Sequence, residues 1–283
     1  MIEFLFKISL LFCIYSMLTI SQNFLLGKVG IVYIGHVVFF AIGAYTTVIL
    51  ITIFSFNSYL TILIAILFSI IISSGLGILT IRLSGHYLLL ASLGTCEIVN
   101  SIINNSRITG GAEGILINNG INDQNIINYY LIIILFVTQI LFFLLLNKSP
   151  KGRIFRAVRD DEVTALLLGH SINKLKLEAI VISAIWASIA GSLYALYSNY
   201  IDPSSFTILE SIAIFIVILI GGIGTIRGSL IGSFIMIVFP ELLRFLNLPS
   251  TLIGPVRQLI IGVILIAIIS YKPEGILGEY KLK

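Results

Sequence analysis

Glu97 is the ionisable side chain whose position is most suggestive of chemistry, because it lies in an apolar stretch of this 283-residue chain, between Cys96 and Ile98. A carboxylate at membrane depth costs about 2.5–3.5 kcal/mol on insertion scales unless it is paired or hydrated. Glu97 could therefore line a polar path or contact an ammonium group. Alternatively, it lies near the outer membrane interface or bonds to a neighbouring helix.

His36 and His86 each follow a glycine at the end of an apolar stretch. Because imidazoles within membrane spans are rare and tend to face polar paths, His36 is a second candidate for such a path. The alternative is that both histidines are interfacial side chains that cap or anchor helices.

Three glycines, Gly221, Gly222 and Gly224, end one apolar segment just before the next begins. Small residues let helices approach closely in lipid, and glycine also permits a tight turn. The alternative to these structural interpretations is a hinge on the translocation path.

The sequence contains no motif for a nucleotide-binding or metal-binding site. The sequence has no G-x-x-x-x-G-K-[ST] run to cradle phosphates, and no H-E-x-x-H or paired Cys/His spacing to hold a metal. We therefore predict no catalytic residue, no metal and no bound cofactor. Work against a gradient would need energy from an ion or a partner protein.

The composition indicates which elements must position these residues. The chain is 58% hydrophobic and 11% charged, whereas soluble domains carry about 25% charged residues. Repeated apolar runs of about 20 residues predict one all-α, polytopic transmembrane bundle of 8–10 spans over residues 1–283, with no nucleic-acid partner. A membrane barrel would instead show short alternating segments.

Nine apolar segments are expected, and the fourth and seventh are short, as in broken or re-entrant helices. They are Phe4–Leu26, Ile31–Phe54, Tyr59–Ile81, Tyr87–Ile103, Ile126–Leu146, Leu175–Ser198, Ile208–Ile220, Leu230–Leu246 and Leu252–Tyr271.

Lysines and arginines concentrate in the loop 148–176, which predicts that this loop is cytoplasmic. Counting spans outward places the C-terminus inside the cell and the N-terminus outside, although Lys7 argues weakly against the latter. The loop 104–125 then lies outside. It could cap the entrance, receive a delivery protein or simply connect two spans.

The cytoplasmic loop predicts a short helix, Arg153–Leu168, because no helix breaker interrupts it and Gly169 follows as a stop. Arg156 and Asp160, and Arg159 and Glu162, have spacings that allow exposed ion pairs. Two interpretations remain open here. The helix lies on lipid headgroups, or it docks against a cytoplasmic motor.

The run GRIFRAVRDDEVTALLLGHSINKLKL resembles the cytoplasmic loop of bacterial ABC-importer permeases of the branched-chain amino acid family. YIGHVVFFAIGAY, RLSGHYLLLASLGTCEIV, TGGAEGI and LIGGIGTIRGSLIGS also resemble segments of that family, in order. Tyr33, Ala41, Ser92 and Thr164 depart from the family pattern. Sister permeases for urea, amides and other small solutes share these motifs.

The resemblance implies a transport subunit of the inner membrane, not an enzyme. Its implied partners are a second, homologous permease, two cytoplasmic ATPase subunits that hydrolyse ATP, and a solute-binding protein outside. The residues implied to couple transport to the ATPases are Gly152, Arg153, Arg156, Arg159, Asp161, Glu162, Ala165 and Gly169. An ion-coupled carrier that works alone is the alternative from another class, and the few acids within the spans argue against it.

Overall fold

The computed structural model describes residues 2–83, 85–117, 126–244, 250–271 and 275–278. These residues form eleven α-helices and one pair of short strands. The helices are α1 Ile2–Phe24, α2 Val37–Thr52, α3 Ser58–Thr80, α4 His86–Asn105, α5 Ile126–Lys148, α6 Pro150–Asp160, α7 Glu162–Leu167, α8 Ile172–Ser198, α9 Ile208–Gly221, α10 Ile226–Arg244 and α11 Ser250–Tyr271. The smaller elements are the π-helical turn η1 Leu25–Val29, the 3-10 turns η2 Ile34–His36, η3 Gly111–Glu113 and η4 Pro203–Phe206, and the strands β1 Ile115–Leu116 and β2 Tyr200–Ile201.

The predicted all-α membrane bundle is confirmed. Six helices of the described part are long and apolar enough to cross a membrane, and two shorter apolar helices accompany them. The expectation that the fourth segment is short or broken was wrong, because α4 is a continuous helix of 20 residues. Its polar C-terminal residues Asn104 and Asn105 are helical, and hydropathy alone truncates them. The seventh segment, α9, is short as expected, with 14 residues.

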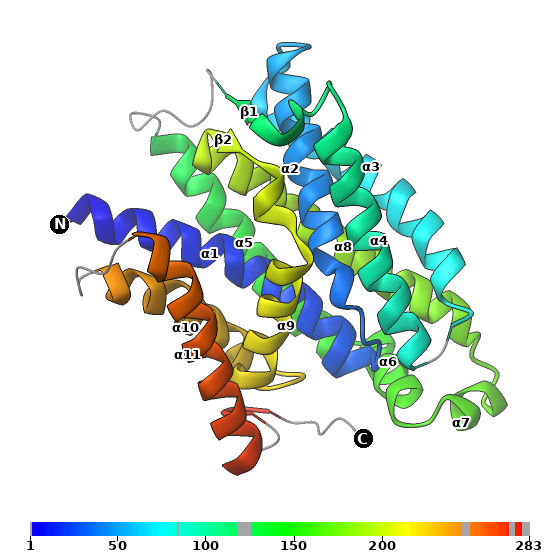
Figure 1. Ribbon diagram of the computed structural model, residues 1–283. Helices are drawn as coiled ribbons and strands as arrows, with labels where there is room; N and C mark the ends of the chain where they lie inside the picture. The colour runs from blue at the N-terminus through cyan, green and yellow to red at the C-terminus, as the bar shows by residue number, and fades with distance from the viewer. Residues whose placement is uncertain (1, 84, 118–125, 245–249, 272–274, 279–283) are drawn as a thin grey trace.

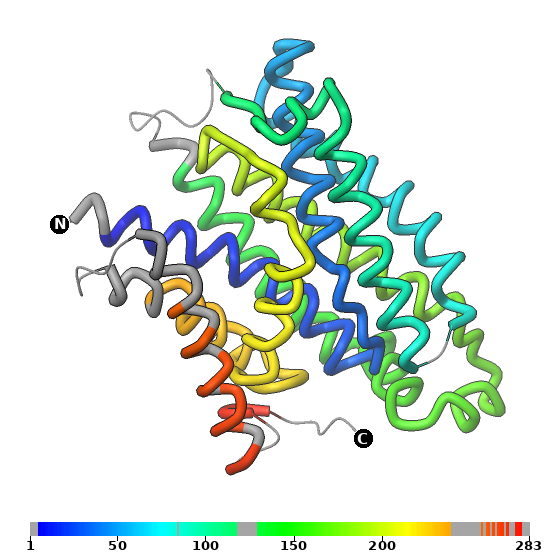
Figure 2. The backbone as a smooth tube through the Cα atoms, in the orientation of Figure 1, coloured from blue at the N-terminus to red at the C-terminus, as the bar shows by residue number. Residues whose placement is uncertain are grey.

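Helix α8 is the centre of the bundle and packs against α2 and α3 (Figures 1 and 2). Small residues make the close contacts, as expected where lipid supplies no hydrophobic force between helices. The Ser69 hydroxyl on α3 donates to the Ala184 carbonyl at 2.9 Å, and the Ser188 hydroxyl on α8 donates to the Ala65 carbonyl at 3.1 Å. These bonds tie α3 to α8 within the buried core.

Glycines bring α2 and α8 even closer. A Cβ on Gly43 would overlap the Ser188 carbonyl, and a Cβ on Gly191 would overlap the Phe40 carbonyl. The Ser192 hydroxyl also donates to the Gly43 carbonyl at 3.2 Å. The two helices run in opposite directions here, since the residue order along one reverses that along the other. A larger residue at Gly43 or Gly191 would therefore have to push α2 and α8 apart.

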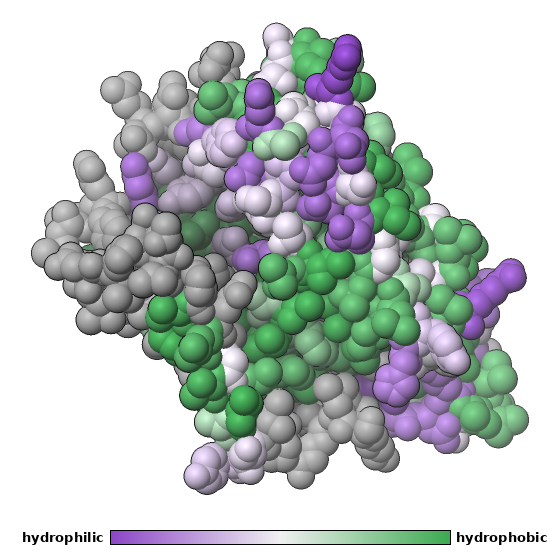
Figure 3. Space-filling model, viewed as in Figure 1, coloured by the Kyte–Doolittle hydropathy of each residue, from purple (hydrophilic) through white to green (hydrophobic). Residues whose placement is uncertain are grey.

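The two ends of the bundle carry different structures (Figure 1). At one end β1 pairs antiparallel with β2, with Ile115 opposite Ile201, an element that the sequence did not predict. At the opposite end lie α6, α7 and the turn between α9 and α10. Figure 3 shows an apolar band across the middle of one face, with hydrophilic side chains gathered towards both ends, as expected for a protein that spans a membrane.

Candidate functional site

Helix α6 begins immediately after α5 because its first residues form a cap. Ser149 has extended backbone, and its hydroxyl accepts a bond from the Gly152 N–H at 3.1 Å, while Pro150 occupies the first turn. A Cβ on Gly152 would overlap the Leu146 carbonyl of α5. Gly152 therefore allows the chain to turn sharply from α5 into α6.

One face of α6 is attached to the end of α1. Phe155 and Val158 are fully buried, and the Phe155 ring meets the Phe24 ring edge-on at 5.6 Å between centroids. The Arg159 guanidinium donates through Nη1 to the Gly27 carbonyl at 2.7 Å. Gly30, at φ +79°, lies against the Arg159 side chain. A movement of α6 would therefore pull directly on the turn η1.

The predicted single helix Arg153–Leu168 was wrong, because the chain breaks at Asp161. This residue has extended backbone (φ −157°, ψ 108°) and caps α7. Its carboxylate accepts from the Val163 N–H at 2.9 Å, from the Thr164 N–H at 3.3 Å and from the Thr164 hydroxyl. These bonds, that from the Thr164 hydroxyl first, lower the pKa of Asp161 below its usual value. The cap is therefore ionised at neutral pH and competes with continuation of α6.

The ion pairs that the spacing allows, Arg156–Asp160 and Arg159–Glu162, do not form among the described residues, since the break changes which side chains meet. Arg159 pairs with its neighbour Asp160 at 2.8 Å, and Glu162 pairs with Lys176 of α8 at 2.6 Å. Lys151 also reaches α8, pairing with Glu178 at 2.9 Å. Exposed pairs of this kind contribute about 0–1 kcal/mol each. The pairs Lys151–Glu178 and Lys176–Glu162 connect α6 and α7 to α8, whereas Arg159–Asp160 lies within α6.

Helix α7 projects apolar side chains away from the bundle. We call Val163, Leu166, Leu167 and Leu168 the α7 tip; all four are exposed, and Leu167 is 81% exposed. Ala165 is buried beneath them. The helix ends where the Gly169 N–H bonds to the Leu166 carbonyl and the His170 N–H to the Ala165 carbonyl, with Gly169 at φ +86°. A contiguous apolar surface of this kind marks a place for a partner or a lipid surface.

The eight residues of the coupling prediction all lie on α6, on α7 or at their ends. They divide by exposure into buried Gly152 and Ala165, half-buried Arg156 and Arg159, and exposed Arg153, Asp161, Glu162 and Gly169. The structure thus brings the set onto one projecting segment.

The glycine turn between α9 and α10 is a close-packed junction. A Cβ on Gly221 would overlap the Gly228 carbonyl of α10, and Gly222 and Gly224 have φ values of +126° and +81°. A Cβ on Gly27 of η1 would overlap the Gly224 backbone. The geometry therefore agrees with both structural interpretations of these glycines. Gly222 and Gly224 form a tight turn, and Gly221 allows α9 and α10 to approach closely.

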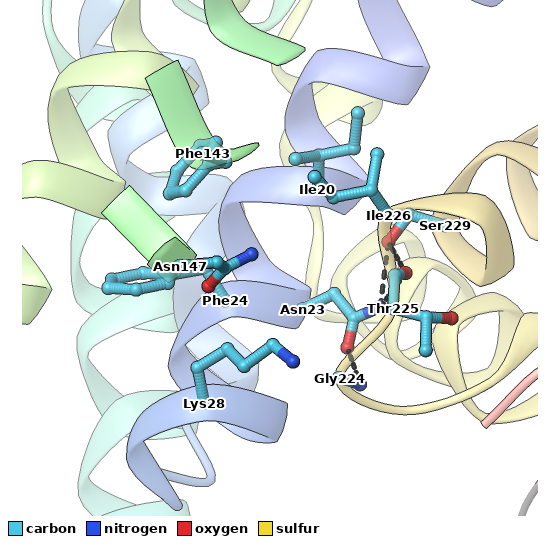
Figure 4. A pocket seen from close by; sticks show the side chains of 10 residues that line it. All are labelled: Ile20, Asn23, Phe24, Lys28, Phe143, Asn147, Gly224, Thr225, Ile226 and Ser229. Carbon is cyan, nitrogen blue, oxygen red and sulfur yellow. Dashed lines mark hydrogen bonds between the residues drawn. The ribbon is translucent and has the colours of Figure 1, made fainter. Parts of the chain in front are cut away.

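Asn23 of α1 holds this turn in place, and sequence reasoning missed it. Its amide nitrogen lies 3.1 Å from the Gly222 and Thr225 carbonyls and 2.7 Å from the Ser229 hydroxyl, and its oxygen accepts from the Gly224 N–H at 2.8 Å (Figure 4). Asn23 is buried. The side chain thereby joins the end of α1, which leads directly into η1, to the glycine turn and the start of α10.

Glu97 lies near the middle of α4 on an exposed face, and among the described residues its carboxylate has no hydrogen bond or ion pair. Leu90, Gly94 and Ser101 are exposed at helical spacing on the same face. The alternative that Glu97 bonds to a neighbouring helix therefore does not hold within the described chain. A carboxylate in this position needs water, a ligand or a partner chain beside it.

His36 is not an interfacial anchor, because it is fully buried at the start of α2. Its Nε2 atom lies 3.0 Å from the Ser21 hydroxyl of α1 and 3.4 Å from the Ser183 hydroxyl of α8. The Ser183 hydroxyl donates to the Ser21 carbonyl at 2.7 Å. The histidine thus lies in a polar contact that joins three helices. Within the described residues no three His, Cys, Asp or Glu side chains cluster as metal ligands do.

Comparison with known proteins agrees with the resemblance read from the motifs. Residues 4–269 match the family described as "Branched-chain amino acid transport system / permease component". The Escherichia coli high-affinity branched-chain amino acid transport system permease protein LivM is 30% identical over 300 residues, covering 95% of this chain and 69% of LivM. BraD of Pseudomonas aeruginosa is 26% identical over 288 residues, covering 94% and 92%.

A second kind of permease protein from the same transport systems is also similar. LivH of Salmonella typhimurium is 23% identical over 287 residues, covering 94% of this chain and 91% of LivH. No solved structure matches the chain. The family predicted from the sequence motifs is confirmed, and this chain belongs to the permease components of branched-chain amino acid transport systems.

Proposed function

We propose that this chain is one permease subunit of an ATP-driven importer that carries branched-chain amino acids across the inner membrane into the cell. It would pair with a second, homologous permease, since both LivM and LivH permease proteins resemble it. Two ATPase subunits would bind and hydrolyse ATP at the end that carries α6 and α7, which would then be cytoplasmic. A solute-binding protein would deliver the amino acid at the end that carries β1 and β2.

The observation that carries the proposal is the α7 tip, an apolar surface on a segment bonded to the ends of α1 and α8. A lipid-surface helix is the competing interpretation. Three consecutive acids, Asp160, Asp161 and Glu162, adjoin the tip. Of these three, Asp160 and Glu162 are paired with basic residues, but Asp161 caps α7 without a basic partner among the described residues. Anionic headgroups would repel its carboxylate, so its position favours a protein partner. Force on the tip would reach η1 through Arg159, and then the glycine turn through Asn23.

Replacing Gly169 by valine tests the coupling. The substitution strains the backbone without causing a steric overlap. Gly169 has a φ of +86°, which a valine rarely adopts, and no neighbouring atom lies within 4 Å of a Cβ built at Gly169. The strain of a β-branched residue there, roughly 1–3 kcal/mol, would alter the end of α7 and lower uptake per ATP hydrolysed by about tenfold. The measurement is amino acid uptake and ATP hydrolysis by the full complex in proteoliposomes, with Glu162→Gln as a second variant.

Gly75→Val is the matched control, because Gly75 is also open to its surroundings but lies on α3 in regular helix. It should leave the ratio of uptake to hydrolysis unchanged. Wild-type ratios in both Gly169→Val and Glu162→Gln would remove α7 from the coupling mechanism. Uptake by the chain alone under an ion gradient, without ATPases, would instead establish an ion-coupled carrier.

We further propose that the exposed face of α4 borders the translocation path, where Glu97 contacts the ammonium group of the amino acid. A charge-assisted hydrogen bond contributes roughly 1.5–3 kcal/mol, so Glu97→Gln should raise the KM for uptake by about tenfold or more. ATP hydrolysis without substrate should be unchanged. Glu113→Gln, which removes an exposed carboxylate at the β1 end, is the control. An unchanged KM in Glu97→Gln would exclude the ammonium contact.

A further inference from the structure

A basic cavity opens at the same end of the bundle as α6, beside the glycine turn. Its volume is about 480 Å³, within the range of ligand sites, and four of the residues that line it are basic. These are Lys28 of η1, Lys148 at the end of α5, Arg156 of α6 and Arg227 at the start of α10. No acidic residue lines it among the described residues. An inner recess of about 20 Å³ adjoins it and shares Lys28, Asn147 and Gly224 (Figure 4).

Among the described residues, no acid is paired with Lys148, Arg156 or Arg227 of the cavity. Asp160, Glu162 and Glu178 are paired with Arg159, Lys176 and Lys151, and Asp161 caps α7. Helix α10 also begins at the cavity, since Ile226 and Arg227 of its first turn line it. Backbone N–H groups at a helix N-terminus favour an anion. Four basic residues and this helix end therefore converge on one concave site.

An apolar stripe along α5 leads to the cavity. Tyr130, Ile134, Val137, Leu141 and Leu145 are exposed at intervals of three or four residues, the spacing of one helix face. Leu144, 44% exposed, continues this face into the cavity lining, and Lys148 ends the helix there. A hydrocarbon chain could follow this face while a charged group occupied the cavity.

We propose that the cavity binds the phosphate of an anionic phospholipid, whose acyl chain lies along the exposed face of α5. A phosphate diester carries the charge that the four basic residues attract, and basic pockets between helices suit such headgroups. The free phosphate ion shares the headgroup chemistry, but it makes no use of the apolar stripe. The stripe therefore favours lipid as the source of the phosphate.

The only tryptophan of the chain provides the readout. Trp186 of α8 packs against Phe142 and Phe143 of α5, at 5.6 and 6.4 Å between ring centroids. Brominated phosphatidylglycerol, titrated into the purified full-length chain in detergent, should quench Trp186 at lower concentration than equally brominated phosphatidylcholine. Neutralising two cavity charges in Lys148→Gln/Arg227→Gln should weaken phosphatidylglycerol binding by about tenfold or more, at roughly 1 kcal/mol for each charge.

The matched control is Arg153→Gln/Lys174→Gln, which removes the same charge from exposed positions of α6 and α8 that do not line the cavity. It should bind phosphatidylglycerol like the wild type. Arg227→Gln alone is the milder variant if the double variant does not fold, and it should weaken binding by several-fold.

Four results would overturn the proposal. Equal quenching by the two lipids would show no headgroup preference, and equal losses in both double variants would show general surface attraction. Displacement of the brominated lipid by millimolar inorganic phosphate would identify a soluble anion as the ligand. If added ATPase subunits released the lipid completely, the cavity would instead be a contact for acidic side chains of those subunits.

Discussion

Gly191→Val is expected to prevent most of the chain from reaching its folded state in the membrane. The new side chain would overlap the Phe40 carbonyl, and backbone cannot rotate aside as a side chain can. Helix α2 would have to move away from α8, with loss of the bond from the Ser192 hydroxyl to the Gly43 carbonyl. Overpacking of a tight contact costs about 3 kcal/mol or more in such cases. The measurement is the yield of folded, monodisperse protein extracted in detergent, together with its thermal unfolding.

The control is again Gly75→Val, because Gly75 lies in an α-helix like Gly191 but no atom lies within 4 Å of its Cβ position. Both variants change helix propensity alike, so any difference between them reports the contact between α2 and α8. Gly43→Val, on the reciprocal side of the contact, should behave like Gly191→Val. Equal yields from Gly191→Val and Gly75→Val would mean that the close approach is not required.

Asn23→Ala is expected to release the glycine turn from α1. The substitution leaves the Gly224 N–H and the Gly222 carbonyl without their partner in a buried place, whereas the Thr225 carbonyl keeps its bonds from Ser229. A buried polar group without a hydrogen bond costs about 1–3 kcal/mol. We therefore expect the free energy of unfolding in detergent to fall by about 3 kcal/mol. In the full complex, uptake per ATP should fall as well, because Asn23 joins the end of α1 to α10.

Asn147→Ala serves as the control, because Asn147 lines the same recess but its side chain makes no hydrogen bond within the described chain. Its stability should stay within about 0.5 kcal/mol of the wild type, as is usual for substitutions that remove no special contact. A double-mutant cycle with Ser229→Ala should give a coupling energy of roughly 0.5–3 kcal/mol. Equal stability of Asn23→Ala and Asn147→Ala would contradict the role of Asn23.

The sequence predicted the helices well because each follows from a local pattern. Hydropathy located α1 to α5 and α8 to α11 to within six residues, the largest difference being the start of α2 at Val37 instead of Ile31. The stop at Gly169 follows from its position after the apolar run. The break at Asp161 also follows from a local pattern. An aspartate can cap a helix by accepting bonds from the backbone N–H groups two and three residues after it. It was misread because the flanking residues are good helix formers on both sides.

The role of Asn23 could not be predicted, because its partners lie about 200 residues away in the chain and depend on how α1 crosses α10. The burial of His36 has the same cause, since Ser183 comes from α8. The exposure of Glu97 was also hidden, because which face of α4 meets other helices depends on how distant segments pack. What local patterns leave open is the pairing of polar side chains between distant helices.

The exposed carboxylate of α4 has a consequence for how the protein is made. In the proposed importer, a copy of the chain inserted without the second permease would leave Glu97 facing lipid, and a carboxylate at membrane depth costs a few kcal/mol. Such an orphan copy would be prone to open locally and to be degraded by membrane proteases. The cellular amount of this subunit should therefore follow that of its partner, so that unequal synthesis of the two is corrected by turnover of the excess.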